Sequence, residues 1–320
     1  MSLLFRSVFL GAATVAGAGG VLLVPTAVQA QSRDTTFSIG RTALLDVTVR
    51  DGYLLVRGSS RTDGEVRTSG SGISIRSVGS GVVVGTGRDD ARSGRSRIGR
   101  DRERDTDDAR VEITVPRGVR VVISGGRADV EVDGIDGDVE VRATSSDIML
   151  RRLGGRAIVE TLSGDIVVSE GVNGFRATTS SGDIEVQGLR GNADVQTHSG
   201  DVNVSGTDVT RFVVETITGD VTLDGSVTED ARVQVSTHTG DVLLRLPERS
   251  RGELQFSTFN GEIHTSFPIT TSAATPGITG RERQTGQGYT FGGGGAARIS
   301  ISTFNGDFRF ERGSGRLIER

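Results

Sequence analysis

A six-residue pattern recurs along this 320-residue chain and constrains its fold more than any other feature. The pattern reads Thr-x-(Ser/Thr/Asn)-Gly-(Asp/Glu)-(Ile/Val/Phe), and its acidic positions lie 18, 18, 19, 21, 21 and 45 residues apart. Degenerate copies extend the series back to Asp147 and Asp129. Self-similarity at such a period predicts a repeat architecture. The complete copies begin at Thr161, Thr179, Thr197, Thr216, Thr237, Thr258 and Thr303.

Each copy has the pattern of a strand, a tight turn and a second strand. Alternate positions before the turn are apolar and then Thr, as in Ala193, Val195 and Thr197, and apolar positions resume at Val202 and Val204. Such alternation directs one side of each strand inward. The turn requires a residue that tolerates positive φ, which is the role we predict for the repeated glycines. These are Gly164, Gly182, Gly200, Gly219, Gly240, Gly261 and Gly306.

Units of this length cannot bury a core alone, whereas stacked units share a continuous apolar column. We therefore predict an all-β fold, a single-chain parallel β-helix (β-solenoid) with 18–21-residue coils about 4.8 Å apart. An antiparallel sandwich built from hairpins also fits short strands with frequent turns. The near-constant unit length favours the solenoid.

Residues 1–30 have the features of a secretory signal peptide. Arg6 precedes an apolar run over 8–24, and Val28-Gln29-Ala30 forms a small-residue cleavage site. We expect cleavage after Ala30 and no transmembrane segment in the mature chain. A membrane anchor is the alternative, but the apolar run contains several glycines and lacks a stop-transfer flank. The expected location is exported: periplasmic, cell-surface or extracellular.

The remainder divides by composition into three parts. Residues 31–110 are expected to form an N-terminal β cap or irregular first coils, with a mobile charged loop at 88–110 that cannot bury a core. Residues 111–310 are the predicted solenoid domain, interrupted by an inserted loop at 268–297, and 311–320 form a C-terminal tail. Phe308 and Phe310 occupy positions held by Ile or Val upstream, which predicts an aromatic plug in the final coil.

Composition narrows the function classes. A net charge of −4 argues against a nucleic-acid-binding protein. The chain contains no Cys, so neither a disulfide nor a Cys-linked lipid is available. No sequence motif indicates a cofactor.

The acidic position of the repeat predicts a column of carboxylates, one per coil. We interpret it as turn chemistry, in which Asp accepts backbone N–H bonds at the bend. The alternative is a calcium column, because Ca²⁺ binds oxygen ligands and would relieve the repulsion between carboxylates. The known nonapeptide calcium repeat requires glycines that are absent here. The candidate calcium ligands are Asp165, Asp183, Asp201, Asp220 and Asp241.

The second position of the repeat should point outward, because it neighbours an inward Thr. It contains His198 and His238, expected to be solvated, and Phe259 and Phe304, expected to stack on adjacent coils. Two interpretations remain open for the Phe pair. Tyr289 and Phe291 of the inserted loop cover it, which we favour, or it binds a partner such as a protein or a glycan.

An enzyme is not expected. The natural comparison is with β-helix polysaccharide lyases and glycosidases, which cluster carboxylates or a basic residue in one groove. Here the acids form a uniform row, and no G-x-S-x-G elbow is present.

Together, the repeated pattern, the segment 115–119 (Val-Pro-Arg-Gly-Val) and Leu246-Pro247 before 256–261 resemble the bacterial putative-adhesin family. These are exported β-strand-repeat proteins with a domain of unknown function, and the resemblance covers roughly residues 34–310. It implies a right-handed β-helix in a cell-envelope setting and offers no catalytic motif. We therefore expect an exported, monomeric, non-catalytic module that contacts an envelope or surface ligand. A self-associating envelope scaffold is the alternative, and a polysaccharide-active β-helix enzyme is less favoured.

Overall fold

The computed structural model of the protein describes residues 33–69, 73–78, 81–86, 110–271 and 287–313, all within the unit Gln31–Arg320. Strands, turns and bends make up these residues, which include no helix able to cross a membrane. The predicted signal peptide and its cleavage site after Ala30 lie outside the described residues. The strands are β1(Arg33–Ser38), β2(Leu44–Ser59), β3(Asp63–Ser69), β4(Ile73–Val78), β5(Gly81–Thr86), β6(Arg110–Pro116), β7(Arg120–Asp133), β8(Val139–Arg142), β9(Ile148–Arg151), β10(Ala157–Glu160), β11(Ile166–Ser169), β12(Val172–Thr178), β13(Ile184–Gln196), β14(Val202–Glu215), β15(Val221–Thr239), β16(Val242–Pro247), β17(Gly252–Ser257), β18(Ile263–Thr265), β19(Ile269–Thr271), β20(Gln287–Phe291), β21(Ala297–Asn305) and β22(Phe308–Gly313).

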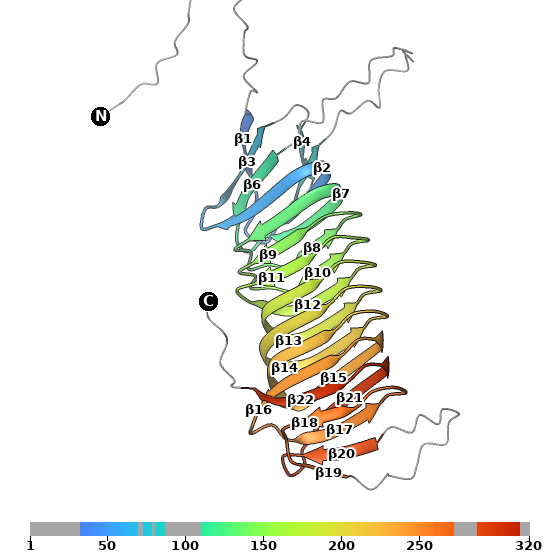
Figure 1. Ribbon diagram of the computed structural model, residues 1–320. Helices are drawn as coiled ribbons and strands as arrows, with labels where there is room; N and C mark the ends of the chain where they lie inside the picture. Colours follow the sequence, from blue (N-terminus) through green and yellow to red (C-terminus); the bar gives the residue numbers. More distant parts are fainter. Residues whose placement is uncertain (1–32, 70–72, 79–80, 87–109, 272–286, 314–320) are drawn as a thin grey trace, which may run out of the picture. The chain divides into compact units, whose positions relative to one another are not determined.

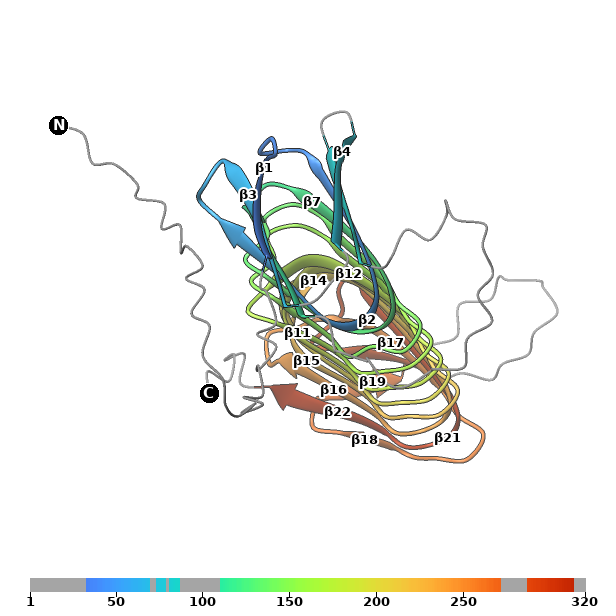
Figure 2. The same cartoon turned by 90° about the horizontal axis from the view of Figure 1, so that it is seen from above.

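From β7 to β18, and again in β21 and β22, the chain forms a stack of parallel rungs, each with two strand segments, and the repeated six-residue pattern is the corner between them in the rungs that carry it (Figure 1). Before the corner, Val195 pairs with Ala177 on one side and Val214 on the other. After it, Ile184 pairs with Ile166 and Val202. Viewed from above, the rungs nest behind one another as flattened loops (Figure 2). The fold is thus all-β and solenoid-like, as the repeat predicts.

The core is a column of Val, Ile and Leu between the two strand segments of each rung. Every second residue is buried, as in β16, where Val242, Leu244 and Leu246 alternate with more exposed side chains. The Thr that ends the first segment is also buried. The hydroxyls of Thr237, Thr258 and Thr303 have no hydrogen-bond partner among the described residues, but in the other four copies the hydroxyl donates to the carbonyl two residues later, as from Thr161 to Ser163 at 2.9 Å. This bond satisfies the hydroxyl and fixes the corner that follows.

At the N-terminal end the order of the rungs differs from the order of the chain. β2 lies between β7 and a rung formed by β5 and β6, with all these pairings parallel. Antiparallel strands finish this end, because β4 pairs with β5, β3 with β6, and β1 with β3. The residues predicted to form a β cap do form strands here. The predicted charged loop at 88–110 lies outside the described residues except for Arg110, which begins β6.

The C-terminal end departs from the predicted order of coils. The sequence predicts that the coil containing Phe308 and Phe310 is the final one of the stack. Instead, β21 and β22 lie between the β15–β16 rung and the β17–β18 rung. The outermost rung is therefore the one formed by 252–265, and the segment later in the sequence is inserted beneath it. Both inserted strands consequently have a parallel neighbour on each side.

Part of the predicted inserted loop is structured. β20 pairs antiparallel with β17 and β19, and residues 272–286 lie outside the described ranges. β22 continues to Gly313, three residues into the predicted tail at 311–320, and 314–320 lie outside the described ranges. Beneath the hairpin the rings pack closely, with Phe267 stacked on Phe310 at 4.3 Å and Phe291 edge-on to Phe310 at 5.0 Å. The aromatic plug is thus made by Phe291 of β20 and by Phe267, which precedes β19, as well as by the predicted Phe308 and Phe310.

Candidate functional site

The repeated turn brings three side-chain columns to one corner of the stack, and its glycines determine how closely the rungs approach. Gly200 has φ 130°. A Cβ placed on it would lie 2.2 Å from the carbonyl oxygen of Gly182, one rung away. All seven predicted turn glycines have positive φ and a neighbouring-rung carbonyl in this position, so the rung spacing as well as the turn requires glycine. They are Gly164, Gly182, Gly200, Gly219, Gly240, Gly261 and Gly306.

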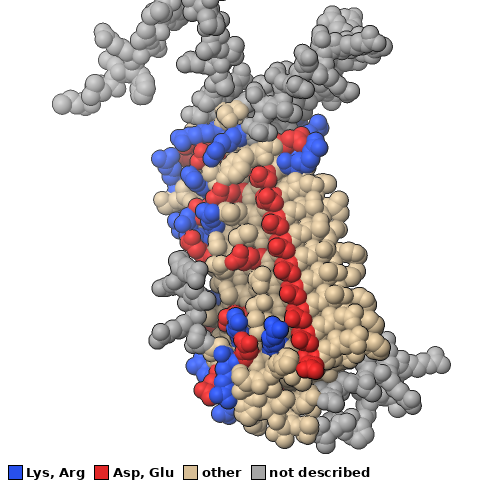
Figure 3. All heavy atoms as spheres, in the orientation of Figure 1, with Lys and Arg blue, Asp and Glu red and all other residues tan. Residues whose placement is uncertain are grey.

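The acidic column runs along the stack next to these glycines (Figure 3). Each carboxylate except that of the terminal Glu262 accepts a hydrogen bond from the backbone N–H of the acidic residue on the next rung. Distances range from 2.7 Å, for Asp241 N to Asp220 Oδ1, to 3.3 Å, for Asp147 N to Asp129 Oδ1. Along the stack, the column is Asp129, Asp147, Asp165, Asp183, Asp201, Asp220, Asp241, Asp307 and Glu262.

These bonds explain how a row of like charges persists. Neighbouring carboxylates at about 5 Å repel by roughly 1 kcal/mol in water. A hydrogen bond to a charged acceptor contributes about 1.5–3 kcal/mol. The column therefore has a structural role as a clamp between rungs. Among the residues that the structure describes, no three His, Asp or Glu side chains converge as metal ligands. The calcium column stays a hypothesis without geometric support.

The outward position of the repeat forms an aromatic ladder at the C-terminal end, defined as His238, Phe304 and Phe259. The rings of His238 and Phe304 stack with centroids 4.8 Å apart, and those of Phe304 and Phe259 at 4.9 Å with an interplanar angle of 2°. Phe259 is 73% exposed and Phe304 43%. The predicted stacking of the two Phe residues is confirmed, and the insertion of β21 between β15 and β17 places His238 in the same ladder.

The favoured cover for this pair is not observed. We expected Tyr289 and Phe291 to shield it, but both belong to β20 and are buried in the core. Phe291 packs edge-on to Phe267 and Phe310. The reason is that β20 adds to the edge of β17, which directs its rings inward. The aromatic ladder is therefore an exposed surface of the described structure.

Further along the same outward column, smaller apolar side chains are exposed. Leu162 is 56% and Ile217 44% exposed, with Ser180 and His198 among the intervening positions. His264 lies elsewhere, at the end of the acidic column, where its Nε2 is 3.9 Å from carboxylate oxygens of both Glu262 and Asp307. Large exposed rings are thus concentrated at the C-terminal end.

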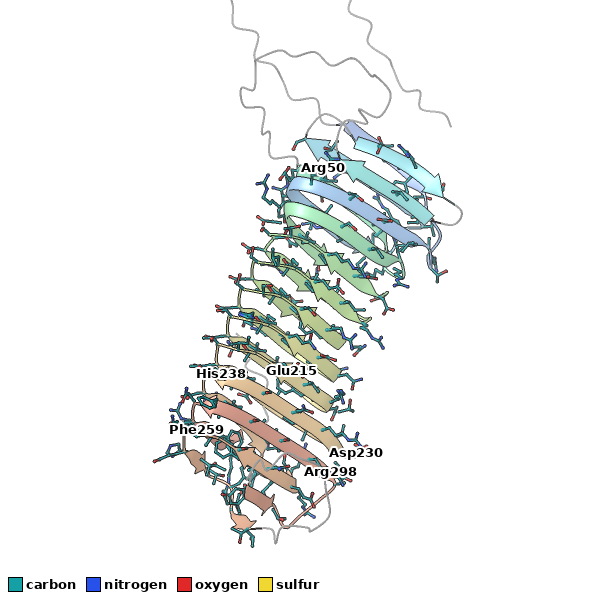
Figure 4. All side chains as sticks on the ribbon, turned by 90° about the vertical axis from the view of Figure 1, so that its right-hand side faces the viewer. Arg50, Glu215, Asp230, His238, Phe259 and Arg298 are labelled. Carbon is teal, nitrogen blue, oxygen red and sulfur yellow. The ribbon has the colours of Figure 1, made fainter. Side chains whose placement is uncertain are left out.

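The strands that lead to the aromatic ladder present a largely polar outer surface, which we name the ladder face. It consists of the outward side chains of 211–215, 232–236, 298–302 and 253–257. Figure 4 shows His238 and Phe259 at one edge and Arg298 at the other. In register at that second edge are Arg211, Arg232 and Arg298. Sequence reasoning missed this arginine column, although each member directly precedes a buried apolar residue, which is Phe212, Val233 or Ile299.

One titrating group outside these columns is perturbed. Burial raises the pKa of Tyr53, and its hydrogen bond to Glu131 raises that pKa further. The guanidinium of Arg110 lies 4.8 Å from the centre of the Tyr53 ring. Tyr53 and Arg110 belong to neighbouring N-terminal strands, so this group ties the first rungs together.

These features define a solenoid-like, all-β repeat protein whose side-chain columns run along its outer surface. The chain belongs to the Toastrack DUF4097 family, whose model matches residues 94–311, which confirms the family resemblance found in the repeats. No curated protein matches the chain.

Three solved structures are similar over 88% of this chain. A putative cell adhesion protein from Clostridium sporogenes is 11% identical, is covered over 100% of its length and has a TM-score of 0.22. A putative adhesin from Bacteroides fragilis is also 11% identical, with 97% coverage and a TM-score of 0.42. A putative lipid binding protein from Parabacteroides distasonis is 9% identical, with 97% coverage and a TM-score of 0.40.

Proposed function

We propose that this protein is an exported, non-catalytic interaction module of the cell envelope or cell surface that binds a glycan through its aromatic ladder. The observation that carries the proposal is the stacked and exposed pair of Phe259 and Phe304. Exposed apolar clusters on otherwise polar surfaces are typical of binding sites. Stacking holds the two rings parallel to each other, so they lose little conformational freedom when a ligand contacts them.

A glycan fits this surface better than an apolar protein segment does. The apolar area is narrow and runs along one edge of the ladder face. Gln234, Ser300 and Gln255 lie four residues before the ladder rings on the same strands, with exposed donors and acceptors. A sugar ring presents an apolar face to an aromatic ring while its hydroxyl groups bind amides and hydroxyls of this kind.

The absence of catalysis is part of the proposal. Carboxylates are the groups expected to hydrolyse glycosidic bonds, and the enzymes that do so place two of them on opposite sides of the scissile bond. In the acidic column each of the carboxylates up to Asp307 is instead hydrogen-bonded to the backbone of the next rung. This use of the acids supports binding without turnover.

Export, coil geometry and oligomeric state complete the proposal. Export depends on the signal-like residues 1–30, with cleavage after Ala30, and the coils are proposed to be right-handed with 18–21 residues each. We propose a monomer rather than an end-to-end scaffold. At both ends of the stack antiparallel strands cover the parallel rungs, which disfavours addition of further rungs.

Replacing Phe259 with Ala tests the function. We expect glycan binding on a printed array to fall by about tenfold or more, since a buried aromatic contact contributes about 1–3 kcal/mol to binding. The melting temperature should stay within about 2 °C, because this ring is exposed. Leu162→Ala, in the same outward column, is the matched control and should bind normally. Light scattering should show that Phe259→Ala is a monomer like the native protein. If this variant then binds glycans as the native protein does, the proposed site is refuted.

A further inference from the structure

The arginine column forms a second set of stacked side chains, at the edge of the ladder face opposite the aromatic ladder. Arg211 pairs in register with Arg232, and Arg232 with Arg298, so the three residues occupy consecutive rungs. All three are exposed. Rungs about 4.8 Å apart place their backbones within about 10 Å along the stack.

The three guanidinium groups have no hydrogen bond or salt bridge to any residue that the structure describes. Other arginines on neighbouring strands are paired, as Arg176 is with Asp194 at 3.1 Å and Arg245 with Glu311 at 3.0 Å. The nearby carboxylate of Asp230 accepts a hydrogen bond from Thr228 at 2.9 Å instead. The three guanidinium groups are therefore unpaired, while Glu253, in register beside Arg298, and Asp230 at the same edge offset part of the positive charge of the column.

The column also lines a hollow. A cavity of about 390 Å³ opens at this edge, and a ligand group entering it would meet the arginines together with shorter polar side chains. The hydroxyl of Thr210 donates to Oδ1 of Asn192 at 2.5 Å, which leaves the amide nitrogen of Asn192 available. The lining residues are Asn192, Thr210, Arg211, Asp230, Arg232, Ala296 and Arg298.

Guanidinium groups bind carboxylate and sulfate oxygens in a bidentate manner, which makes Arg the preferred partner for such anions. A row of three unpaired guanidinium groups at the rung spacing therefore suits a polymer with repeated acidic groups. The row and the aromatic ladder lie on the same ladder face; on β15 and β21 an arginine and a ring are six residues apart, or about 20 Å, as Arg232 is from His238 and Arg298 from Phe304. Figure 4 shows Arg298 and Asp230 at one edge of this face and Phe259 at the other.

We propose that the arginine column is the subsite for the acidic groups of an anionic glycan, whose sugar rings extend across the ladder face toward the aromatic ladder. This assignment rests on the proposed glycan-binding function and specifies its substrate class. A glycan fits better than an anionic membrane, because the intervening side chains are polar. Gln234, Ser300 and Gln255 are exposed there, whereas Val213 is buried.

The test measures binding of the purified protein to polygalacturonate, which carries carboxylates, to dextran sulfate and to neutral dextran. We expect Arg232→Gln to weaken binding of an acidic polymer about tenfold. The triple variant Arg211→Gln, Arg232→Gln, Arg298→Gln should weaken it about a hundredfold or more. A charge-matched control replaces three exposed arginines of the N-terminal rungs, which should leave affinity unchanged. Those residues are Arg41, Arg50 and Arg117.

The two acidic polymers distinguish the acidic group that the site binds. If binding of polygalacturonate depends on the arginine column, the site takes carboxylates, and if binding of dextran sulfate depends on it, the site takes sulfates. The proposal is overturned if the triple variant binds both polymers as the native protein does, or if the control loses as much affinity. It is also overturned if neither polymer binds, or if phosphatidylglycerol vesicles bind more tightly with the same dependence on the column.

Phe259→Ala separates this inference from the proposed function. If Phe259→Ala loses binding and the triple variant binds fully, the arginine subsite is refuted and the aromatic site is supported. If the triple variant loses binding and Phe259→Ala binds fully, the aromatic site is refuted and the arginine subsite is supported.

Discussion

Each residue of the repeated turn has a separate physical task. The buried Thr hydroxyl fixes the corner, as Thr179 does by donating to the carbonyl of Ser181 at 3.1 Å. The Gly leaves room for a carbonyl of the rung on one side, as Gly200 does for Gly182, and the Asp accepts the N–H of the rung on the other side, as Asp201 does from Asp220. The position between Thr and Ser has no structural partner of this kind. It is consequently the position at which side chains vary, and there the exposed rings occur.

The close approach between rungs at the turn glycines can be tested by substitution. Gly200→Ala introduces a Cβ 2.2 Å from the carbonyl oxygen of Gly182, and backbone atoms on both rungs must move to relieve the contact. Gly191→Ala is the matched control, because Gly191 has φ 76° but no atom within 4 Å of the added Cβ. We expect the control to cost about 1 kcal/mol from φ alone. Gly200→Ala should cost roughly 2–4 kcal/mol.

Thermal and urea melts of the two glycine variants provide the measurement. Equal losses of stability would show that φ alone selects glycine at these turns. A larger loss for Gly200→Ala assigns the difference to the contact between rungs.

At this scale the sequence predicts the turn well and the exposure of the aromatic ladder poorly. The repeat alone places Phe259 and Phe304 outward and on adjacent rungs. It does not reveal whether another segment covers them, because that depends on the pairing of β20 with β17. Phe291 and Tyr289 are apolar enough for either role, and the alternation imposed by that pairing directs both into the core.

At the scale of the elements, each short strand that follows the repeated turn is held to the neighbouring rungs by the carboxylate–backbone hydrogen bonds of the acidic residue that precedes it. β11 contains four residues, too few for an isolated strand, yet it lies between β9 and β13 with parallel pairing on both sides. The acidic column begins each such strand with a carboxylate–backbone bond between rungs. The register of the rungs is thus specified at the corner as well as by the apolar column.

A substitution pair in the acidic column tests this clamp. Asp201 Oδ1 accepts the N–H of Asp220 at 2.8 Å, and Asp201→Ala removes that acceptor. We expect a loss of about 1–2 kcal/mol in the free energy of unfolding. Asp201→Asn retains an acceptor oxygen and removes one repelling charge, so its stability should match or exceed that of the native protein.

Chemical denaturation of both Asp201 variants, repeated with EGTA, provides the measurement. An equal loss in both variants would show that the charge of Asp201, rather than its acceptor oxygen, stabilises the stack. A midpoint for the native protein that falls in EGTA would revive the calcium hypothesis.

At the scale of the whole stack, the order of the rungs is the feature that the sequence does not predict. The spacing of 45 residues between the last two copies is compatible with either order, because local patterns of apolar residues, Thr and Gly are the same in every rung. Long-range packing decides the order. With the 252–265 rung outermost, β20 pairs with β17, and Phe291 reaches the rings of Phe267 and Phe310.

The two ends of the stack follow the same principle. β2 at one end and the β21–β22 rung at the other each lie one rung in from the outermost parallel rung. An edge strand has unpaired backbone groups on one side and separates readily from the stack. Placing these strands between two rungs gives them hydrogen bonds on both sides, while hairpins cover the outer rungs.

The inserted order can be tested by disulfide formation, since the chain contains no Cys. Gln234 is in register with Ser300, and Ser300 with Gln255, so Gln234 and Gln255 lie two rungs apart. Adjacent rungs place Cα atoms about 4.8 Å apart, within the range for a disulfide, whereas two rungs give about 9.6 Å, beyond it. After mild oxidation, Gln234→Cys with Ser300→Cys should lose its free thiols, and Gln234→Cys with Gln255→Cys should retain them. Stacking in chain order requires the opposite result, because it makes Gln234 and Gln255 neighbours.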